Sequence, residues 1–116
     1  MRYARAVVLI FILLMSAVFL TGCPPPVADA SLQFYNDSSG NDVYAVYLKS
    51  VDSDDWGENL ITREIRPGNS EIITDLYPGT YNIKVSYETP EGWCFSRVPS
   101  TELVLVSREA VEFHFL

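Results

Sequence analysis

The sequence predicts an all-β protein, a small antiparallel β-sandwich of about seven to eight strands, behind an apolar N-terminal segment. Two observations predict this fold. Short runs rich in Val, Ile, Tyr, Phe and Leu recur about every ten residues after residue 30, and Gly, Pro, Asn and Asp separate them. The 86 residues from Ser31 to Leu116 are enough for one domain with one core.

The first 22 residues have the pattern of an export signal. Residues 1–5 are basic, with Arg2 and Arg5, and residues 6–20 are apolar except for Ser16. A stable transmembrane helix needs about 20 apolar residues, whereas this run has roughly 15 and is followed by prolines rather than basic residues. We therefore expect a cleaved, helical signal peptide rather than a membrane-spanning anchor.

The end of the apolar run, Leu20-Thr21-Gly22-Cys23, resembles the bacterial lipobox. The resemblance implies cleavage between Gly22 and Cys23 and attachment of a diacylglycerol to the Cys23 thiol, commonly with an amide-linked acyl chain. Two or more acyl chains anchor a protein stably, whereas one binds only marginally. We expect a lipoprotein of the cell envelope that is anchored to a membrane and faces the periplasm or the exterior. The alternative is an ordinary signal peptide beside a chance cysteine.

Prolines follow the cysteine and predict a linker. The segment Pro24-Pro25-Pro26 favours extended polyproline geometry, so residues 23–30 form a stiff spacer. At about 3.1 Å per residue, it holds a domain roughly 20 to 25 Å from the bilayer. The expected organisation is a signal peptide (1–22), a lipidated cysteine with a Pro-rich linker (23–30) and a β-sandwich domain (31–116).

Eight segments of the domain have the composition of strands, and no helix is expected there. Their ranges are 32–36, 43–49, 60–65, 71–76, 81–88, 93–97, 101–106 and 111–116. Residues 37–42 predict a hairpin, Pro67-Gly68 and Pro78-Gly79 fit the central pair of type II turns, and residues 90–92 form a fourth turn.

Alternation of side chains predicts which residues face the core. The expected inward residues are Val46, Leu48, Tyr81, Ile83, Val85, Tyr87, Val111, Phe113 and Phe115. Glu112 and His114 alternate with the last three, so we expect them to face solvent.

Part of the domain resembles known small β-sandwich modules. The segment "NDSSGNDVYAVYLKSVDSDDWGENLI", followed by "IRPGNSEIITDLYPGTYNIKVSY", is similar to small bacterial modules of the transthyretin-like or carboxypeptidase regulatory-like type. The resemblance covers about Gln33 to Tyr87. It implies a sandwich with an accessory or structural role, and it brings no catalytic residues.

The charge of the chain argues against nucleic acid as a partner. The formal net charge is −7, and loss of Arg2 and Arg5 with the signal peptide makes it −9. Such a surface repels phosphate backbones and attracts cations or basic partners.

Residues suited to catalysis are few, and we expect no catalytic site and no cofactor. His114 is the single histidine, and a nucleophile pair with Cys94 would need a third orienting group and an oxyanion site. If Cys23 carries lipid, Cys94 has no partner for an intramolecular disulfide. We expect Cys94 to be a small buried hydrophobe beside Trp93 and Phe95, with intermolecular pairing as the alternative. One Cys and one His are too few for a metal site of the usual spacing.

The acidic stretch 50–59 is the weak metal candidate. The oxygen ligands of Asp52, Asp54, Asp55 and Glu58 are of the kind that calcium takes, but the spacing then puts Trp56 where a further ligand belongs. The resembling modules keep the Trp-Gly step, which implies a structural role for Trp56 and Gly57. We expect the indole to cover one open end of the sandwich.

These observations favour a structural or protein-interaction module over an enzyme, with an envelope protein as the expected partner. A small ligand-binding domain for calcium or glycan is the alternative, because tyrosines and tryptophans form stacking surfaces for sugars. An enzyme comes third.

Overall fold

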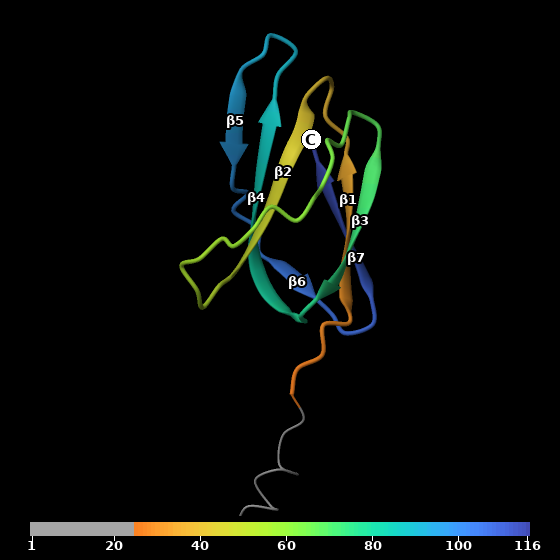
Figure 1. The fold of residues 1–116 in the computed structure, drawn as a ribbon, viewed down its shortest axis with the longest axis vertical. Helices are drawn as coiled ribbons and strands as arrows, with labels where there is room; N and C mark the ends of the chain where they lie inside the picture. The colour runs from red at the N-terminus through yellow and green to blue at the C-terminus, as the bar shows by residue number, and fades with distance from the viewer. Residues whose placement is uncertain (1–24) are drawn as a thin grey trace, which may run out of the picture.

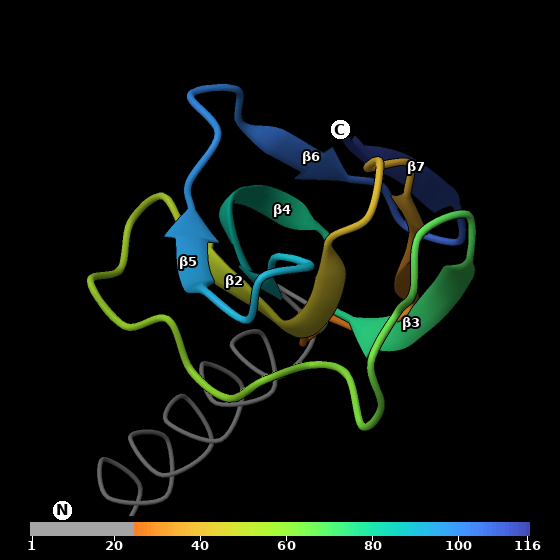
Figure 2. The ribbon, with the colours of Figure 1, turned by 90° about the horizontal axis from the view of Figure 1, so that it is seen from above.

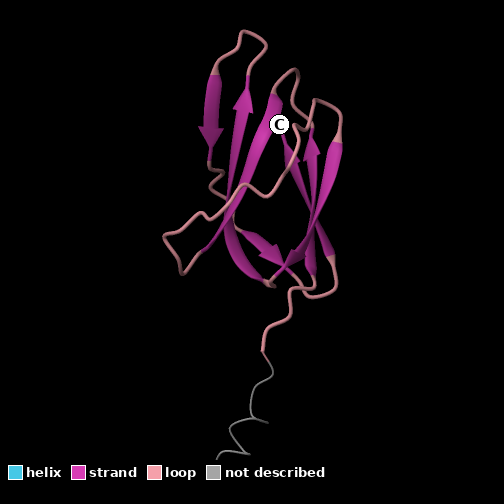
Figure 3. Cartoon of the chain, in the orientation of Figure 1, coloured by secondary structure: helices cyan, strands magenta, loops and turns pink. Residues whose placement is uncertain are grey.

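The structure, a computed structural model, describes residues 25–116. The signal peptide, its cleavage position after Gly22 and the proposed lipidation at Cys23 lie outside the described residues. Within them the chain is all-β and forms two packed sheets, and Figure 3 shows strands joined by loops. No helix in this range is long and apolar enough to cross a membrane. The strands are β1 (Ala30–Asn36), β2 (Asp42–Ser50), β3 (Ser70–Leu76), β4 (Gly79–Glu88), β5 (Cys94–Arg97), β6 (Leu103–Leu105) and β7 (Ala110–Phe115).

The two sheets have different widths. One has the order β3-β1-β7, and the other has the order β2-β4-β5 with β6 also paired to β4. The chain passes from sheet to sheet between β1 and β2, β2 and β3, β3 and β4, and β6 and β7, whereas β4 and β5 form an antiparallel hairpin. The sandwich prediction is thus confirmed, with seven strands in the described range.

One strand pair departs from the expected antiparallel arrangement, because β1 and β7 are parallel. Both strands begin at the same end of the molecule, where the Ser31 N–H donates to the Glu109 carbonyl and the Arg108 N–H donates to the Asp29 carbonyl. The chain reaches β7 from β6, which pairs with the first residues of β4 at this end. The path through β6 therefore sets the direction of β7.

The core lies between the sheets and follows the predicted alternation. Its fully buried aliphatic and aromatic side chains include Leu32, Phe34, Val46, Ile83 and Val85. Other inward side chains complete it, namely Leu48, Tyr81, Tyr87, Val111, Phe113 and Phe115. Every residue predicted to face inward therefore packs in this core or against it. Successive residues of a strand point to opposite faces, so one register places the whole apolar set inside.

Three local predictions are wrong. Residues 60–65 are not a strand but part of the long loop between β2 and β3, with a single bridge between Ile65 and Val43. Residues 37–42 do not form a hairpin, since β1 and β2 belong to different sheets. Pro78-Gly79 is not a type II turn, because Gly79 is at φ 155° and opens β4. In each case the chain crosses between sheets, which local sequence does not encode.

Two turns form as predicted. At Pro67-Gly68, the Asn69 N–H donates to the Arg66 carbonyl at 3.0 Å, and Gly68 has φ +82°. The Gly92 N–H donates to the Thr89 carbonyl at 2.9 Å and closes the hairpin between β4 and β5.

The long loop covers the outer edge of β2. Figure 2 shows it as the light-green segment that passes outside β2 on its way to β3. The Asn59 side chain accepts a hydrogen bond from the Val46 N–H at 3.0 Å and donates one to the Tyr44 carbonyl at 3.1 Å. The Leu60 N–H donates to the Val46 carbonyl at 2.9 Å, and Ile61 enters the core. The backbone groups of Tyr44 and Val46 at this edge are therefore paired by the loop.

Candidate functional site

Two large exposed aromatic side chains adjoin each other on and next to the edge strand β5. Trp93 is 68% exposed and Phe95 is 51% exposed. All four residues of β5 are exposed, and within the described residues this strand pairs with β4 alone. Large exposed apolar groups that adjoin one another mark interaction surfaces more often than singly scattered ones do.

Trp93, Phe95 and Arg97 form a row on one side of this strand, the side that faces the core. The Phe95 ring lies 5.9 Å from that of Tyr87, and the Arg97 guanidinium lies 5.1 Å from the centre of the Phe115 ring. The Arg97 Nη1 also donates to the Leu116 backbone oxygen at 2.9 Å. The row lies next to the core at its edge. Trp93 and Phe95 are more than half exposed, so no strand of the other sheet covers them.

The edge of β5 also carries free backbone groups. The Thr89 N–H donates to the Trp93 carbonyl at 2.8 Å, so this pair is of the hydrogen-bonded kind. Hydrogen-bonded pairs recur at every second residue of an antiparallel ladder, which directs the backbone of Phe95 and Arg97 toward β4 as well. The N–H and C=O groups of Cys94 and Ser96 therefore point away from β4. We call the row Trp93, Phe95 and Arg97, with the outward backbone of Cys94 and Ser96, the β5 edge surface.

The β5 edge surface lies far from the N-terminal linker. In Figure 1 the linker enters β1 at one end of the sandwich, and the hairpin between β4 and β5 projects at the other end. Sequence reasoning missed this surface. The available signal was the alternation of Trp93, Phe95 and Arg97 after a Pro-Glu-Gly turn, which indicates a face but not its exposure.

Cys94 is exposed, so the expectation that it is a buried hydrophobe is wrong. The register of β5 places its side chain on the outer face, opposite Glu88. Tyr44 is 38% exposed on the same face. Its pKa is raised by burial and further by the neighbouring Cys94 thiol. The pairing Cys94–Glu88 puts the thiol on the solvent side, whereas Trp93 and Phe95 face inward.

His114 faces solvent on the other sheet, as its alternation predicts. Its Nδ1 contacts Asp37 Oδ2 at 2.5 Å, its Nε2 lies 3.4 Å from Glu112 Oε2, and its ring stacks on Tyr35 with centres 4.5 Å apart. The hydrogen bond to Asp37, then that to Glu112, raises the pKa of His114. Because Cys94 lies on the outer face of the opposite sheet, the two residues are not brought together as a nucleophile and a base.

The acidic loop uses its polar groups on its own backbone. Asp55 Oδ1 accepts a hydrogen bond from the Gly57 N–H at 2.9 Å, and Ser53 Oγ accepts one from the Asp55 N–H at 3.1 Å. Gly57 has φ +68°, a conformation that glycine adopts without strain. Asp52, Asp54 and Glu58 are exposed. In residues 25–116 no three His, Cys, Asp or Glu side chains are grouped so that they hold a metal ion.

Trp56 lies over the outer face of the β2–β4 pair rather than over an open end. Lys84 Nζ is 4.9 Å from the centre of its ring and 4.6 Å from that of Tyr47, and Lys49 Nζ is 5.7 Å from the indole. The indole is only partly buried. The ammonium groups of these two lysines lie near the indole and help to attach the loop to the sheet.

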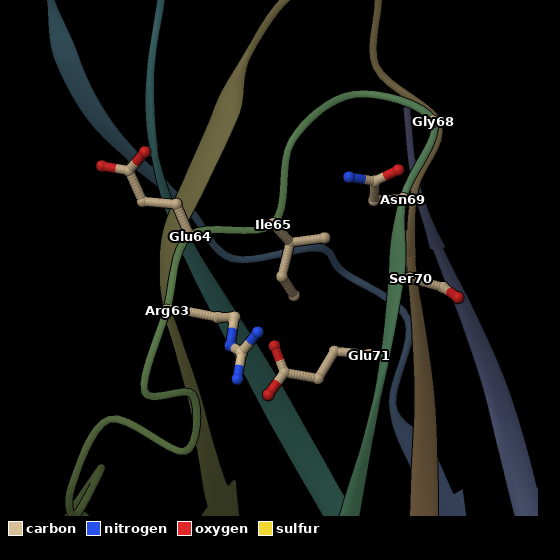
Figure 4. A pocket seen from close by; sticks show the side chains of 7 residues that line it. All are labelled: Arg63, Glu64, Ile65, Gly68, Asn69, Ser70 and Glu71. Carbon is tan, nitrogen blue, oxygen red and sulfur yellow. The ribbon is translucent and has the colours of Figure 1, made fainter.

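An open cleft lies beside the start of β3, between this strand and the long loop. Figure 4 shows the side chains of Arg63 and Glu71 extending toward each other across it, with Ile65 behind them. Gly68, Asn69 and Ser70 complete the wall. The lining is mainly polar and charged, and no buried polar side chain points into the cleft without a partner. It lacks the apolar lining that is typical of small-molecule sites.

Comparisons with known proteins find no match for this chain among family models, curated proteins or solved structures. The fold of residues 25–116 is a small seven-stranded β-sandwich. We therefore infer its function from its surfaces.

Proposed function

We propose that this protein is a lipid-anchored module of the bacterial cell envelope that holds a protein partner away from the membrane. The anchor is Cys23, released as a new N-terminus by cleavage after Gly22. The partner surface is the β5 edge surface. The protein performs no catalysis and uses no cofactor in this role.

One observation carries the proposal: the linker enters the sandwich at one end, and the hairpin between β4 and β5, which leads into the exposed apolar row, projects at the other. A lipid at Cys23 brings the linker end to the bilayer, because only residues 24–29 separate it from β1. The hairpin between β4 and β5 then lies at the end of the domain away from the anchoring membrane. Aromatic side chains with this exposure are typical of the residues that dominate binding at protein interfaces.

The anchor is tested by labelling cells that express the full chain with a radioactive or alkyne-tagged fatty acid. The wild-type chain is expected to incorporate label and to fractionate with membranes. Cys23→Ala should lose the label and remain as a longer precursor, whereas Cys94→Ala should retain the label. Label on the Cys23→Ala chain would contradict the proposal.

A glycan-binding role is the second candidate, and one observation favours it. Lys84 lies between the rings of Tyr47 and Trp56 and makes no ion pair among the described residues. Aromatic faces beside a free ammonium suit an acidic sugar. In a Trp93→Phe background, Trp56 is the remaining tryptophan. A saturable change of its fluorescence with polygalacturonate, lost on Lys84→Ala, would favour this role over the first.

A further inference from the structure

We infer that the β5 edge surface binds a partner by strand addition, and that the partner segment is an extended peptide in which apolar residues alternate with basic ones. This inference rests on the proposed function and specifies the partner's chemistry. Three features support this inference: the free backbone of β5, the row of side chains beside this strand and the charge around it.

The free backbone requires a polypeptide as occupant. Cys94 and Ser96 direct their N–H and C=O groups away from β4, and no backbone partner meets them within residues 25–116. An exposed strand edge is a template for another strand, and proteins usually cover it or break it. The chain covers the edge of β2 with a loop through Asn59 and Leu60, but it leaves β5 open. Only an extended backbone matches this pattern of donors and acceptors.

The side-chain row requires apolar residues at alternate positions of the partner. Residues of an added strand that face the core side of the sheet lie beside Trp93 and Phe95. Phe95 is supported from behind by Tyr87, and Arg97 by Phe115. Trp93 and Phe95 thus form an apolar surface on which alternate Val, Ile, Tyr or Phe side chains lose contact with water.

The negative charge near β5 favours basic residues at the remaining positions of the partner segment. Glu88 lies opposite Cys94 on the outer face, and Glu91 is in the hairpin turn. The whole chain has a formal charge of −7. A segment with Lys or Arg on its outer face is attracted to this hairpin, whereas a second copy of the chain brings like charge. The position of the hairpin away from the linker also disfavours the anchoring membrane as occupant.

The inference is tested with the full chain in lipid nanodiscs and an array of nine-residue peptides in which Lys or Arg alternates with Val, Ile, Tyr or Phe. The readout is amide hydrogen exchange of β5 by NMR. A binding peptide should slow exchange of the Cys94 and Ser96 amides at least tenfold. The amides of Phe95 and Arg97, which already bond to β4, should change little.

Matched variants separate strand addition from other binding. Ser96→Pro removes an outward N–H and the hydroxyl bond to Ser86 on β4, but no backbone bond to β4, and it should abolish binding. Ser96→Ala loses the same hydroxyl and keeps the N–H, so it should keep binding, as should Ser96→Thr. Trp93→Ala and Phe95→Ala should raise the Kd at least tenfold. Ile72→Ala, which truncates an equally exposed side chain on β3, should leave the Kd unchanged. Circular dichroism of each variant checks that the fold is retained.

Three outcomes of the peptide experiments overturn the inference: no peptide of the array binds, a bound peptide leaves the Cys94 and Ser96 amides unprotected, or Ser96→Pro binds as well as Ser96→Thr. Protection of the same amides without peptide, increasing with protein concentration, would identify a second copy as the occupant and also overturn it. Each of these results leaves fatty-acid labelling of Cys23 unaffected, so failure here is distinct from failure of the anchor.

Discussion

Asn36 joins three segments of the domain through one buried side chain. It is fully buried, its Nδ2 donates to the carbonyls of Asn41 and Ile65 at 2.7 Å, and its Oδ1 accepts from the Ser38 hydroxyl at 2.6 Å. Gly68 also donates its N–H to the Asn36 carbonyl at 2.7 Å. The end of β1, the crossing to β2 and the start of β3 are thereby fixed to one another.

Replacing Asn36 by Ala should lower the free energy of unfolding by roughly 2 to 4 kcal/mol, because several buried polar groups lose their partners together. Urea unfolding at equilibrium measures the change. Asn82→Ala is the control, since Asn82 faces outward on β4 and should stay within about 0.5 kcal/mol of wild type. Equal effects of the two substitutions would contradict the role assigned to Asn36.

His114 should titrate above its ordinary pKa of about 6.5, because Asp37 and Glu112 hydrogen-bond its charged form. A group whose pKa is raised in the folded state stabilises that state below its unfolded pKa, and the contribution is lost as pH rises through the folded pKa. The single histidine of the chain makes an NMR titration unambiguous. Asp37→Asn should lower the measured pKa and flatten the pH dependence of unfolding in this window. An unchanged pKa would refute the assignment to Asp37.

Trp56 was expected to cover one open end of the sandwich, and its observed position lowers the loss of stability expected on its removal. Because the partly buried indole contacts Lys49 and Lys84 on an outer face, Trp56→Ala should cost about 1 to 2 kcal/mol rather than the larger loss of a core aromatic. Thermal unfolding measures this, with exposed Trp93→Ala as the matched control. Millimolar calcium should leave the melting temperatures of both variants unchanged. A rise with calcium that is lost on Asp54→Asn would instead favour a metal site.

At the scale of elements, strands with one buried face could be predicted from the sequence, whereas their partners could not. Alternation in 81–88 and 111–116 identifies the core side because its period equals that of a strand. Residues 60–65 also include apolar side chains, but they form a loop and not a strand. Ile61 and Ile65 reach the core from this loop, which the Asn59 side chain attaches to β2. The exposure of β5 depends on the width of the opposite sheet. Such long-range packing leaves no local pattern.

The cover on the edge of β2 is itself testable. Asn59→Ala removes three hydrogen bonds of the Asn59 side chain, two of them to the backbone of β2 and one to Ile61, and should destabilise the domain by roughly 1 to 2 kcal/mol. Exchange of the Val46 amide should become faster than that of amides bonded between β2 and β4. Asn41→Ala is the control, because Asn41 accepts hydrogen bonds from Asn36 and Ser38 through its backbone carbonyl. Unchanged protection of Val46 would show that the loop does not need Asn59.

At the scale of the molecule, residues 25–116 contain one core and should fold without the preceding segment. A polypeptide of these residues should be rich in β-structure and unfold in a single cooperative transition, because both sheets share the same buried side chains. Circular dichroism and differential scanning calorimetry test this. In the native state Cys94 should react with a thiol reagent within a few-fold of the rate in denaturant, since it is exposed on the outer face. A reaction that is slow in the native state and accelerates only on unfolding would show that Cys94 is buried. It would contradict the register of β5, on which the β5 edge surface depends.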